Sequence, residues 1–439
     1  MNSYIHSVSL DSEKCKGCTT CMKHCPTEAI RVFHQVAHIN PDRCIDCGEC
    51  IRVCPHNAKK ANYNRLEQIK EFKWKIALPA PALFAQFDGL DDIGYVLQGL
   101  LDLGFDDVFE VSQAAEFVTS YSRQYLKTPG VCKPVISSAC PAVVRLICLR
   151  FPYLKDNIMP LLPPVEVAAA MAKEKAAKEH PELKEEEIGV CFISPCPAKV
   201  SYVENGFGSY KSRIDLVVPI SEVYFKLINV MNRDVKPEIT TKTGVIGISW
   251  ASSGGEASGL LTDRVLAADG INNVIQVLEK VENGNIPSLD FIELNACTGG
   301  CVGGVLTIEN PFIARNRLQT LRKYRPVSRN THKGDYIPEE RFFNEMPTYK
   351  PLSRLSDNIG ESMKLLAKIQ AVREDLPGID CGACGSPNCR AFAEDLVLGK
   401  ADFNDCIIGY KKLIKQYINA KGREDDPDDS GFFSGKTEP

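Results

Sequence analysis

Residues 291–304 read FIELNACTGGCVGG. The stretch begins as a short apolar strand and ends in a glycine-rich turn that carries Cys297 and Cys301. Glycines in such a turn let the backbone approach a bulky group closely. The chain has nineteen cysteines in 439 residues, and in a reducing compartment so many thiols indicate metal ligation rather than disulfides. The sequence therefore predicts a metal centre at this turn.

The composition is that of an ordinary globular protein with about three domains. Hydrophobic residues make up 44% of the chain and charged residues 25%, and the formal net charge of −4 offers no broad basic surface for nucleic acid. No apolar run reaches the roughly 18 residues needed to span a membrane, and residues 1–10 lack the plan of a signal peptide. We therefore expect a cytoplasmic protein with no nucleic-acid partner and no membrane span.

Residues 1–68 contain two copies of the motif C-x2-C-x2-C-x3-C-P. This spacing matches bacterial two-cluster ferredoxins, in which the fourth cysteine of each run binds the other cluster. One expected [4Fe–4S] ligand set is Cys15, Cys18, Cys21 and Cys54. The other expected set is Cys44, Cys47, Cys50 and Cys25. A pair of zinc knuckles is the alternative, and the repeated Cys-Pro step argues against it.

Short apolar runs alternate with amphipathic segments across residues 69–355, which predicts βαβ units and parallel sheets. The expected strands are residues 75–78, 108–111, 134–138, 189–193, 244–248 and 291–294. The expected helices are residues 92–104, 114–126, 143–149 and 165–179. The Lys/Glu run at 173–187 is interpreted as a solvated helix face rather than a binding patch.

Four thiols of this middle region follow expected strands: Cys140, Cys196, Cys297 and Cys301. Ligands of open parallel sheets collect at the carboxyl ends of the strands, so these thiols are expected to converge on one centre. The other three cysteines of the region lack this context and are expected to be small buried hydrophobes. They are Cys132, Cys148 and Cys191.

A third cysteine cluster lies in residues 356–416. An expected helix at 357–372 precedes it, and a second expected helix at 390–399 lies between its third and fourth cysteines. Its members are Cys381, Cys384, Cys389 and Cys406. Four thiols with this spacing can hold a further [4Fe–4S] cluster, and a four-thiolate zinc site is the alternative. Residues 417–439 are acidic and poor in core residues, so we expect a disordered tail there.

The three central motifs resemble the signatures of the [FeFe]-hydrogenase active-site domain, which run T-S-C-C-P, P-C-x-x-K and E-x-M-A-C-x-x-G-C-x-G-G. Here they read SACP at 138–141, PCPAK at 195–199 and ELNACTGGCVGG at 293–304. Residues 252–257, SSGGEA, are similar to the family's glycine-rich T-G-G-x-x-E-A region. The resemblance covers essentially the whole chain, and the C-terminal cysteine unit resembles that of divergent, sensory-type members.

By this resemblance Cys140, Cys196, Cys297 and Cys301 would hold a [4Fe–4S] cubane, the fourth such cluster of the chain. Cys301 would also bridge to a diiron subsite that carries CO, CN⁻ and an azadithiolate. Lys199 would donate a charge-assisted hydrogen bond to one cyanide. Further contacts to the cofactor are expected from Ala80, Pro81, Ala82, Pro195 and Gly300.

The chain departs from the family where protons are delivered. Ala139 replaces the first cysteine of T-S-C-C-P, and alanine can neither donate nor accept a proton. Tyr202 stands where the family has a relay glutamate, and two methionines near the diiron unit are replaced by Ser194 and Asn295. Glu204 and Glu256 are the candidate replacement relays. We therefore expect the whole cofactor to bind but to turn over slowly.

The expected architecture is an α/β active-site domain flanked by an α+β ferredoxin-like domain and a small, mainly helical C-terminal domain. The resemblance implies reversible conversion of H2 to protons and electrons, with a ferredoxin or a signalling protein as redox partner and dedicated maturation machinery for the diiron unit. H2 sensing is the related alternative. A non-catalytic iron–sulfur assembly protein and an electron-transfer subunit, both without the diiron subsite, are the rival classes.

Overall fold

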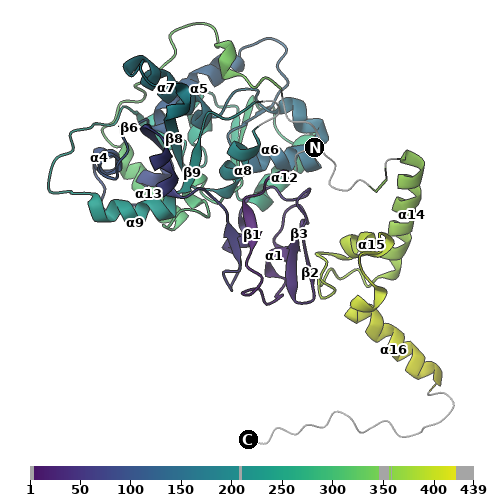
Figure 1. Ribbon diagram of the computed structural model, residues 1–439. Helices are drawn as coiled ribbons and strands as arrows, with labels where there is room; N and C mark the ends of the chain where they lie inside the picture. Colours follow the sequence, from purple (N-terminus) through teal and green to yellow (C-terminus); the bar gives the residue numbers. More distant parts are fainter. Residues whose placement is uncertain (1–3, 207–209, 346–354, 357, 422–439) are drawn as a thin grey trace, which may run out of the picture. The chain divides into compact units, whose positions relative to one another are not determined.

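The computed structural model describes residues 4–206, 210–345, 355–356 and 358–421. By their contacts the described residues form two units (Figure 1). Among the described residues, the first unit draws on residues 4–14, 24–29, 39–206 and 210–345, and the second joins residues 15–23 and 30–38 to residues 355–356 and 358–421. The first cysteine repeat is thus divided between the two units.

A four-stranded parallel sheet forms the centre of the first unit. Its strand order is β6 (Asp107–Val108), β5 (Trp74–Pro79), β8 (Ile188–Ser194) and β9 (Leu216–Pro219). Successive residues of a strand point to opposite faces, and both faces here are buried. Ile76 and Leu78 belong to one hydrophobic core and Ala77 to the other.

Helices cover both faces of this sheet (Figure 1). One core takes side chains from α5 (Val111–Tyr125) and α7 (Pro164–Glu179). The other core takes side chains from α4 (Gly94–Asp102), α9 (Ile220–Val230) and α13 (Pro311–Arg322). The layers explain why β8 is apolar along its whole length, as is usual for a strand buried on both faces.

A second parallel sheet has the order β10 (Val265–Asp269), β11 (Phe291–Asn295) and β7 (Val135–Ile136). Helices α6 (Pro141–Arg150) and α12 (Ile271–Glu282) follow β7 and β10. The expectation of parallel sheets built from βαβ units is therefore confirmed.

Shorter elements complete the first unit. Its remaining strands are β1 (Val8–Leu10) and β4 (Lys59–Ala61), which pair antiparallel. Its remaining α-helices are α2 (Glu49–Arg52), α3 (Pro81–Phe84), α8 (Pro197–Asn205), α10 (Val245–Ser249) and α11 (Gly255–Gly259). Its 3₁₀ turns are η1 (Leu66–Glu71), η2 (Pro152–Asn157), η3 (Glu185–Glu187), η4 (Cys301–Gly303) and η5 (Glu339–Arg341).

The second unit is mainly helical. It contains α1 (Thr20–Lys23), α14 (Ile359–Asp375), α15 (Cys389–Val397), η6 (Phe403–Asp405) and α16 (Ile407–Lys421). The strands β2 (Ile30–Phe33) and β3 (Val36–Ile39) form a two-stranded sheet. Helix α16 runs to Lys421, so the first five residues of the expected disordered tail are helical, and residues 422–439 lie outside the described residues.

The strand expected at 244–248 is wrong, because the structure has helix α10 there. A short apolar run has too few residues for its periodicity to separate a strand from a buried helix. A Cβ at Gly247 would lie 2.1 Å from the Ser112 carbonyl oxygen, so glycine allows α10 to pack tightly against the start of α5. The strand expected at 108–111 ends at Val108, and β9 and β10 are strands that the sequence patterns do not predict.

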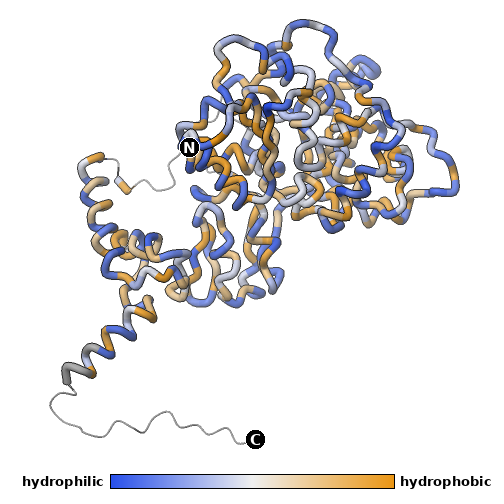
Figure 2. Tube along the Cα trace, turned by 180° about the vertical axis from the view of Figure 1, so that it is seen from behind, coloured by the Kyte–Doolittle hydropathy of each residue, from blue (hydrophilic) through white to orange (hydrophobic). Residues whose placement is uncertain are grey.

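Apolar segments gather in the interior of the first unit (Figure 2). Cys148 and Cys191 are buried there as expected, at 6% and 0% exposure. The expectation for Cys132 is wrong, because its side chain is exposed. Among the described helices, none combines the length and the apolar character that crossing a membrane requires.

Candidate metal centre

Four cysteine thiols meet where strands of the two parallel sheets end. Cys140 and Cys196 are the N-cap residues of α6 and α8, each of which has proline at its first position. Cys297 and Cys301 follow β11. Because β7 and β11 are parallel neighbours, their carboxyl ends carry Cys140 and Cys297 to the same edge.

The thiols are close enough for Cys196 and Cys140 to raise the pKa of Cys297 and of Cys301. Burial raises the pKa of Cys301 to about 12, and the neighbouring thiols of Cys196 and Cys140 contribute to this rise. Burial also raises the pKa of Cys297, with Cys196, Cys140 and Cys301 adding to the effect. Buried thiols that cannot easily ionise, as at Cys196, Cys297 and Cys301, suit a cationic metal centre, which would displace their protons on binding.

Glycines let the turn after β11 fold against the neighbouring loops. Gly300 has φ of +88°, and a Cβ on it would lie 2.5 Å from the backbone nitrogen of Ser253. A Cβ on Gly304 would lie 2.1 Å from the carbonyl oxygen of Pro195, which accepts a hydrogen bond from the Leu306 backbone at 3.0 Å. The cysteine turn is therefore held against both the SSGGEA loop and the loop of Cys196.

Substitution of Gly300 by alanine is expected to destabilise the first unit. The loss of stability should be larger than the backbone strain that any alanine suffers at a positive φ. The control is Gly284→Ala, because Gly284 has φ of +68° and nothing lies within 4 Å of the position that a Cβ would take there. Gly284→Ala should cost about 1–2 kcal/mol from backbone strain, and Gly300→Ala should exceed it because the Ser253 backbone must move. Equal shifts of the thermal unfolding midpoint in the two variants would contradict this account.

Lys199 lies in the interior beside the thiols. It is 8% exposed on α8, and its Nζ donates a 2.9 Å hydrogen bond to the carbonyl oxygen of Ala139. Its positive charge acts to lower the pKa of both Cys196 and Cys301, against the larger effect of burial. The ammonium thus connects the first two motifs and faces the thiol cluster, with further donors left for an anionic group.

A pair of buried carboxyl groups lies behind Ala139. The Ala139 backbone N–H donates to Ser137 Oγ at 3.2 Å, and Ser137 Oγ donates to Glu256 Oε2 at 2.5 Å. Glu256 is 3% exposed, and its Oε1 has no hydrogen-bond partner among the described residues. Glu293 is 4% exposed on β11. Burial raises the pKa of Glu256 well above its usual value, and the Glu293 carboxylate raises it further.

Glu293 differs from Glu256 because its carboxylate accepts several hydrogen bonds. It accepts hydrogen bonds from the backbones of Gly254 and Ala257 at 3.0 and 2.9 Å and from Asn295 Nδ2 at 2.8 Å. Burial raises its pKa, but these donors act in the opposite direction. The pair therefore favours a proton on Glu256 and a negative charge on Glu293.

Ser137 and Glu293 are site residues to which the sequence assigns no role, although Glu293 is the first residue of the motif ELNACTGGCVGG. The available signal is a glutamate inside the apolar run FIELN, since an unpaired carboxyl is rarely buried in a strand. The other relay candidate, Glu204, has an exposed side chain on α8. Because its side chain is exposed, Glu204 is excluded as a buried proton relay.

The loop expected to contact the cofactor leads from β5 into α3. Ala80 and Ala82 are buried there, at 5% and 0% exposure, and α3 contacts the turn η4 that starts at Cys301. Pro81 is the first residue of α3. The structure therefore places Ala80, Pro81 and Ala82 next to the cysteine turn.

The second cysteine repeat supplies a further thiol group in the first unit. Burial raises the pKa of Cys44 and of Cys47, and Cys25 and Cys50 are among the neighbours that raise both further. Cys25 therefore lies with the three cysteines of the other repeat, as the crossed pattern predicts. Arg52, the last residue of α2 in the same repeat, donates to the Gly303 carbonyl oxygen at 2.6 Å, so this repeat adjoins the turn of Cys301.

The cysteines of the C-terminal cluster line one small cavity within the second unit. All four contribute to it: Cys381, Cys384, Cys389 and Cys406. Burial raises the pKa of Cys384, and Cys406 and Cys381 raise it further. This convergence suits a metal or an iron–sulfur cluster.

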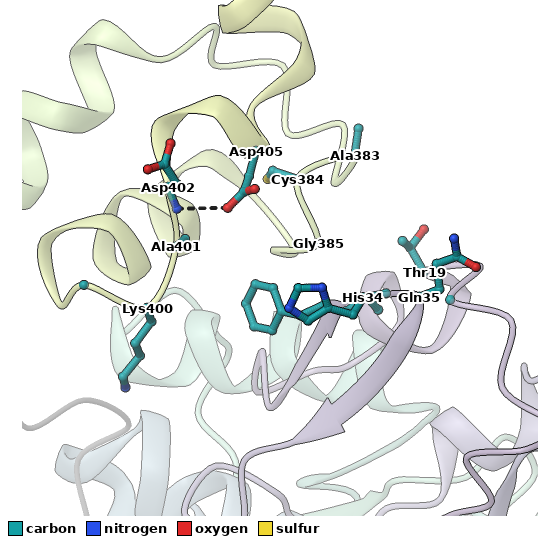
Figure 3. Close-up of a pocket in the computed structure, with 14 residues that line it drawn as sticks. Thr19, His34, Gln35, Ala383, Cys384, Gly385, Lys400, Ala401, Asp402 and Asp405 are labelled. Atoms are coloured by element: carbon teal, nitrogen blue, oxygen red, sulfur yellow. Dashed lines mark hydrogen bonds between the residues drawn. The ribbon is translucent and has the colours of Figure 1, made fainter.

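A second pocket, of about 910 Å³, lies in the same unit (Figure 3). Thr19 of the first repeat and His34 of the β2–β3 turn line one side, and Cys384 and Asp405 lie opposite.

Two contacts hold the walls of this pocket together. The Val32 backbone N–H donates to the Gly385 carbonyl oxygen at 2.8 Å. A largely buried ion pair joins Arg31 to Asp395 at 2.5 Å. These contacts bring the C-terminal cysteine loop against the first repeat.

Family models match all three cysteine regions. The model "Iron only hydrogenase large subunit, C-terminal domain" matches residues 73–238 and 229–305. A model for a 4Fe-4S dicluster domain matches residues 7–55, and a model for an Fe-S cluster matches residues 376–408. These matches support iron–sulfur cofactors in each region.

Curated relatives are distant. The NADP-reducing hydrogenase subunit HndD of Solidesulfovibrio fructosivorans is 24% identical over 62% of this chain and 55% of its own. A cytosolic Fe-S cluster assembly factor of Drosophila erecta is 25% identical over 30% of this chain and 24% of its own. The chain therefore spans between about a quarter and just over half of the length of these relatives.

Among solved structures, a variant of the [FeFe]-hydrogenase HydA1 from Chlamydomonas reinhardtii is similar with a TM-score of 0.45 and 17% identity. That match covers 57% of this chain and 84% of the other. The hydrogenase family model covers more than half of the present chain, including all four convergent thiols. The chain belongs to the family of iron-only hydrogenase large subunits.

Proposed function

We propose that the protein is an [FeFe]-hydrogenase that interconverts H2 with protons and electrons, with slow turnover. The observation that carries this proposal is the convergence of four thiols beside the buried ammonium of Lys199. A thiolate-bound cubane is an anion, so it would account for the thiols and for part of the need for a buried positive charge. The cyanide ligands of a diiron subsite would add further negative charge and hydrogen-bond acceptors that suit the remaining N–H groups of Lys199.

The residues present fit the full cofactor. Cys140, Cys196, Cys297 and Cys301 would hold the cubane, and Cys301 would also hold the diiron subsite. The glycines of its turn let the backbone pack closely against the neighbouring loops. When bound, the diiron subsite supplies an open iron position for H2 and a basic bridge amine. Lys199 would donate to a cyanide while its bond to the Ala139 carbonyl fixes its position.

Proton movement is assigned to the residues behind Ala139. The hydroxyl of Ser137 and the carboxyl of Glu256 form a short hydrogen-bonded path that starts next to this position. Glu256 holds a proton because it is buried beside the Glu293 carboxylate. The missing thiol at Ala139 leaves a gap at the start of the path, which accounts for the expected slow turnover.

Electrons would travel through the iron–sulfur clusters at both ends of the chain. The loop of the second repeat adjoins the active-site turn through Arg52, so the cluster on Cys25, Cys44, Cys47 and Cys50 is the proposed neighbour of the cubane. The C-terminal cluster is assigned to exchange electrons with the first repeat, which shares its pocket. A ferredoxin or a signalling protein would be the external partner, and H2 sensing would use the same chemistry.

Infrared spectroscopy tests the proposal directly. After anaerobic maturation of the full chain with the diiron precursor, we expect sharp CO and CN⁻ bands and H2-dependent changes in them. A protein with complete [4Fe–4S] loading and no such bands would contradict the proposal. That result would favour a non-catalytic iron–sulfur assembly protein; the Drosophila erecta relative is named as a cytosolic Fe-S cluster assembly factor.

Restoring the missing thiol should raise the rate. Ala139→Cys is expected to increase H2 production per bound diiron unit by about 10–100-fold, the usual effect of a residue beside a metal site, because a thiol can relay the proton that alanine cannot. The control is Cys132→Ala, which removes an exposed thiol outside the site. An unchanged rate in Ala139→Cys, with intact infrared bands, would show that proton delivery at this position does not limit turnover.

A further inference from the structure

Lys59 is a buried lysine without a partner among the described residues. It lies on β4, is 3% exposed, and its Nζ makes no hydrogen bond to any described residue. Its neighbour Lys60 is exposed and pairs with Asp11 at 2.8 Å. An ammonium that is buried without compensation costs several kcal/mol, so an anionic group is expected beside it.

The neighbour of Lys59 is the thiol of Cys54. Burial tends to raise the pKa of Cys54, but backbone N–H groups of residues 56, 58 and 59 and the charge of Lys59 outweigh it and lower the pKa. The Ala58 N–H donates to Cys54 Sγ at 3.3 Å. Lys59 therefore adds positive charge where a cluster ligand must be a thiolate.

The internal repeat shows that this charge belongs to one repeat alone. Ala29 N–H donates to Cys25 Sγ at 3.2 Å, so the backbone after each Cys-Pro step makes the same N–H···S bond. The residue that follows is Ile30 in the first repeat and Lys59 in the second. Ile30 is 2% exposed, so both positions are buried and they differ by one charge.

We propose that Lys59 is the counter-charge of the [4Fe–4S] cluster bound through Cys54 and holds its reduction potential above that of the other N-terminal cluster. A thiolate-bound cluster is an anion, and taking up one electron makes it more negative. A fixed positive charge in a low-dielectric interior stabilises the reduced form. The cluster on Cys54 is then reduced before the other N-terminal cluster and holds the electron on its way between the partner and the active site. This inference rests on the electron-transfer role in the proposed function.

The test is an EPR-monitored redox titration of the full chain with all clusters loaded, comparing Lys59→Met with Lys60→Met. Both variants remove one charge from β4, but only Lys59 is buried. In Lys59→Met we expect one cluster to need a lower potential, with at least a tenfold smaller reduced-to-oxidised ratio at fixed potential. That change equals about 59 mV for one electron. Lys60→Met should leave all potentials unchanged, because exposed charges are screened.

Further outcomes separate the charge of Lys59 from its packing. Lys59→Arg, which keeps the charge, should keep the wild-type potentials. Equal potentials in wild type and Lys59→Met, or equal shifts in Lys59→Met and Lys60→Met, would overturn the inference. If Lys59→Met loads less iron and sulfide, Lys59→Gln provides the neutral variant for the same comparison. A wild-type protein with no reducible N-terminal cluster would instead remove the proposed electron-transfer role.

Discussion

Replacing Cys301 with alanine is expected to abolish H2 turnover and to prevent the CO and CN⁻ infrared bands from forming. Cys301 is the one thiol assigned to both the cubane and the diiron subsite, so its loss removes the attachment of the catalytic iron. The fall in rate should exceed the roughly 10–100-fold that loss of an outer-shell partner costs a metal site. Gas chromatography of H2 and infrared spectra of the matured protein measure the two effects.

The control for this variant is Cys191→Ala. Cys191 is fully buried in the middle of β8, but it belongs to the hydrophobic core rather than to the thiol cluster. Its loss should lower stability by about 1 kcal/mol, the order expected for a small cavity, and leave the infrared bands in place. If Cys301→Ala kept CO and CN⁻ bands of wild-type intensity, the bridging role would have to pass to another residue.

Cysteine spacing is enough to predict several of the thiol groups that the structure brings together. In the two repeats the ligands are neighbours in sequence, so local spacing alone carries the pattern. The crossing of Cys25 to the second repeat follows from the same pattern, and the structure places it with Cys44, Cys47 and Cys50. For the central thiols, the position of each one after an apolar strand is sufficient, because parallel strands bring their ends together.

Features that depend on side-chain packing are harder to predict. Helix α10 resembles a strand in sequence because the run from Gly244 to Ile248 is apolar on all sides in either conformation. Strand β10 gives a weak signal because its sequence VLAAD contains two alanines, which carry little strand preference. In both cases the neighbours that decide the conformation lie far away in the sequence.

The pairing of Glu256 with Glu293 has the same origin. Glu256 lies in a glycine-rich loop and Glu293 in a strand, and only the fold brings their carboxyl groups together beside Ser137. The sequence offers Glu256 and Glu204 as equal candidates for the relay. The structure separates these two by burial, at 3% exposure for Glu256 against an exposed Glu204.

Glu256→Gln is expected to lower H2 production by about 10²–10⁴-fold, the usual contribution of a positioned acid–base group. Glutamine has the shape of glutamic acid and can keep the hydrogen bond to Ser137, but it cannot release or take up a proton. The CO and CN⁻ bands should remain, because no cluster ligand is altered. The rate is therefore expressed per bound diiron unit, with infrared intensity as the measure of loading.

Glu204→Gln is the control for this variant and should turn over at the wild-type rate, since Glu204 is a surface carboxylate. Equal rates in wild type and Glu256→Gln would take Glu256 out of the proton path. A large loss in Glu204→Gln would instead place the path at the surface of α8.

The stability of the wild type should also depend on pH through Glu256. Because the pKa of Glu256 is raised in the fold, its contribution is complete below the unfolded value of about 4.3 and declines as pH rises towards the folded value. Between pH 5 and pH 8 the thermal midpoint of the wild type should thus fall relative to that of Glu256→Gln. Parallel pH curves for the two proteins would mean that Glu256 is already ionised in the folded state. A carboxylate with no proton to give at neutral pH could serve only as an acceptor in H2 oxidation.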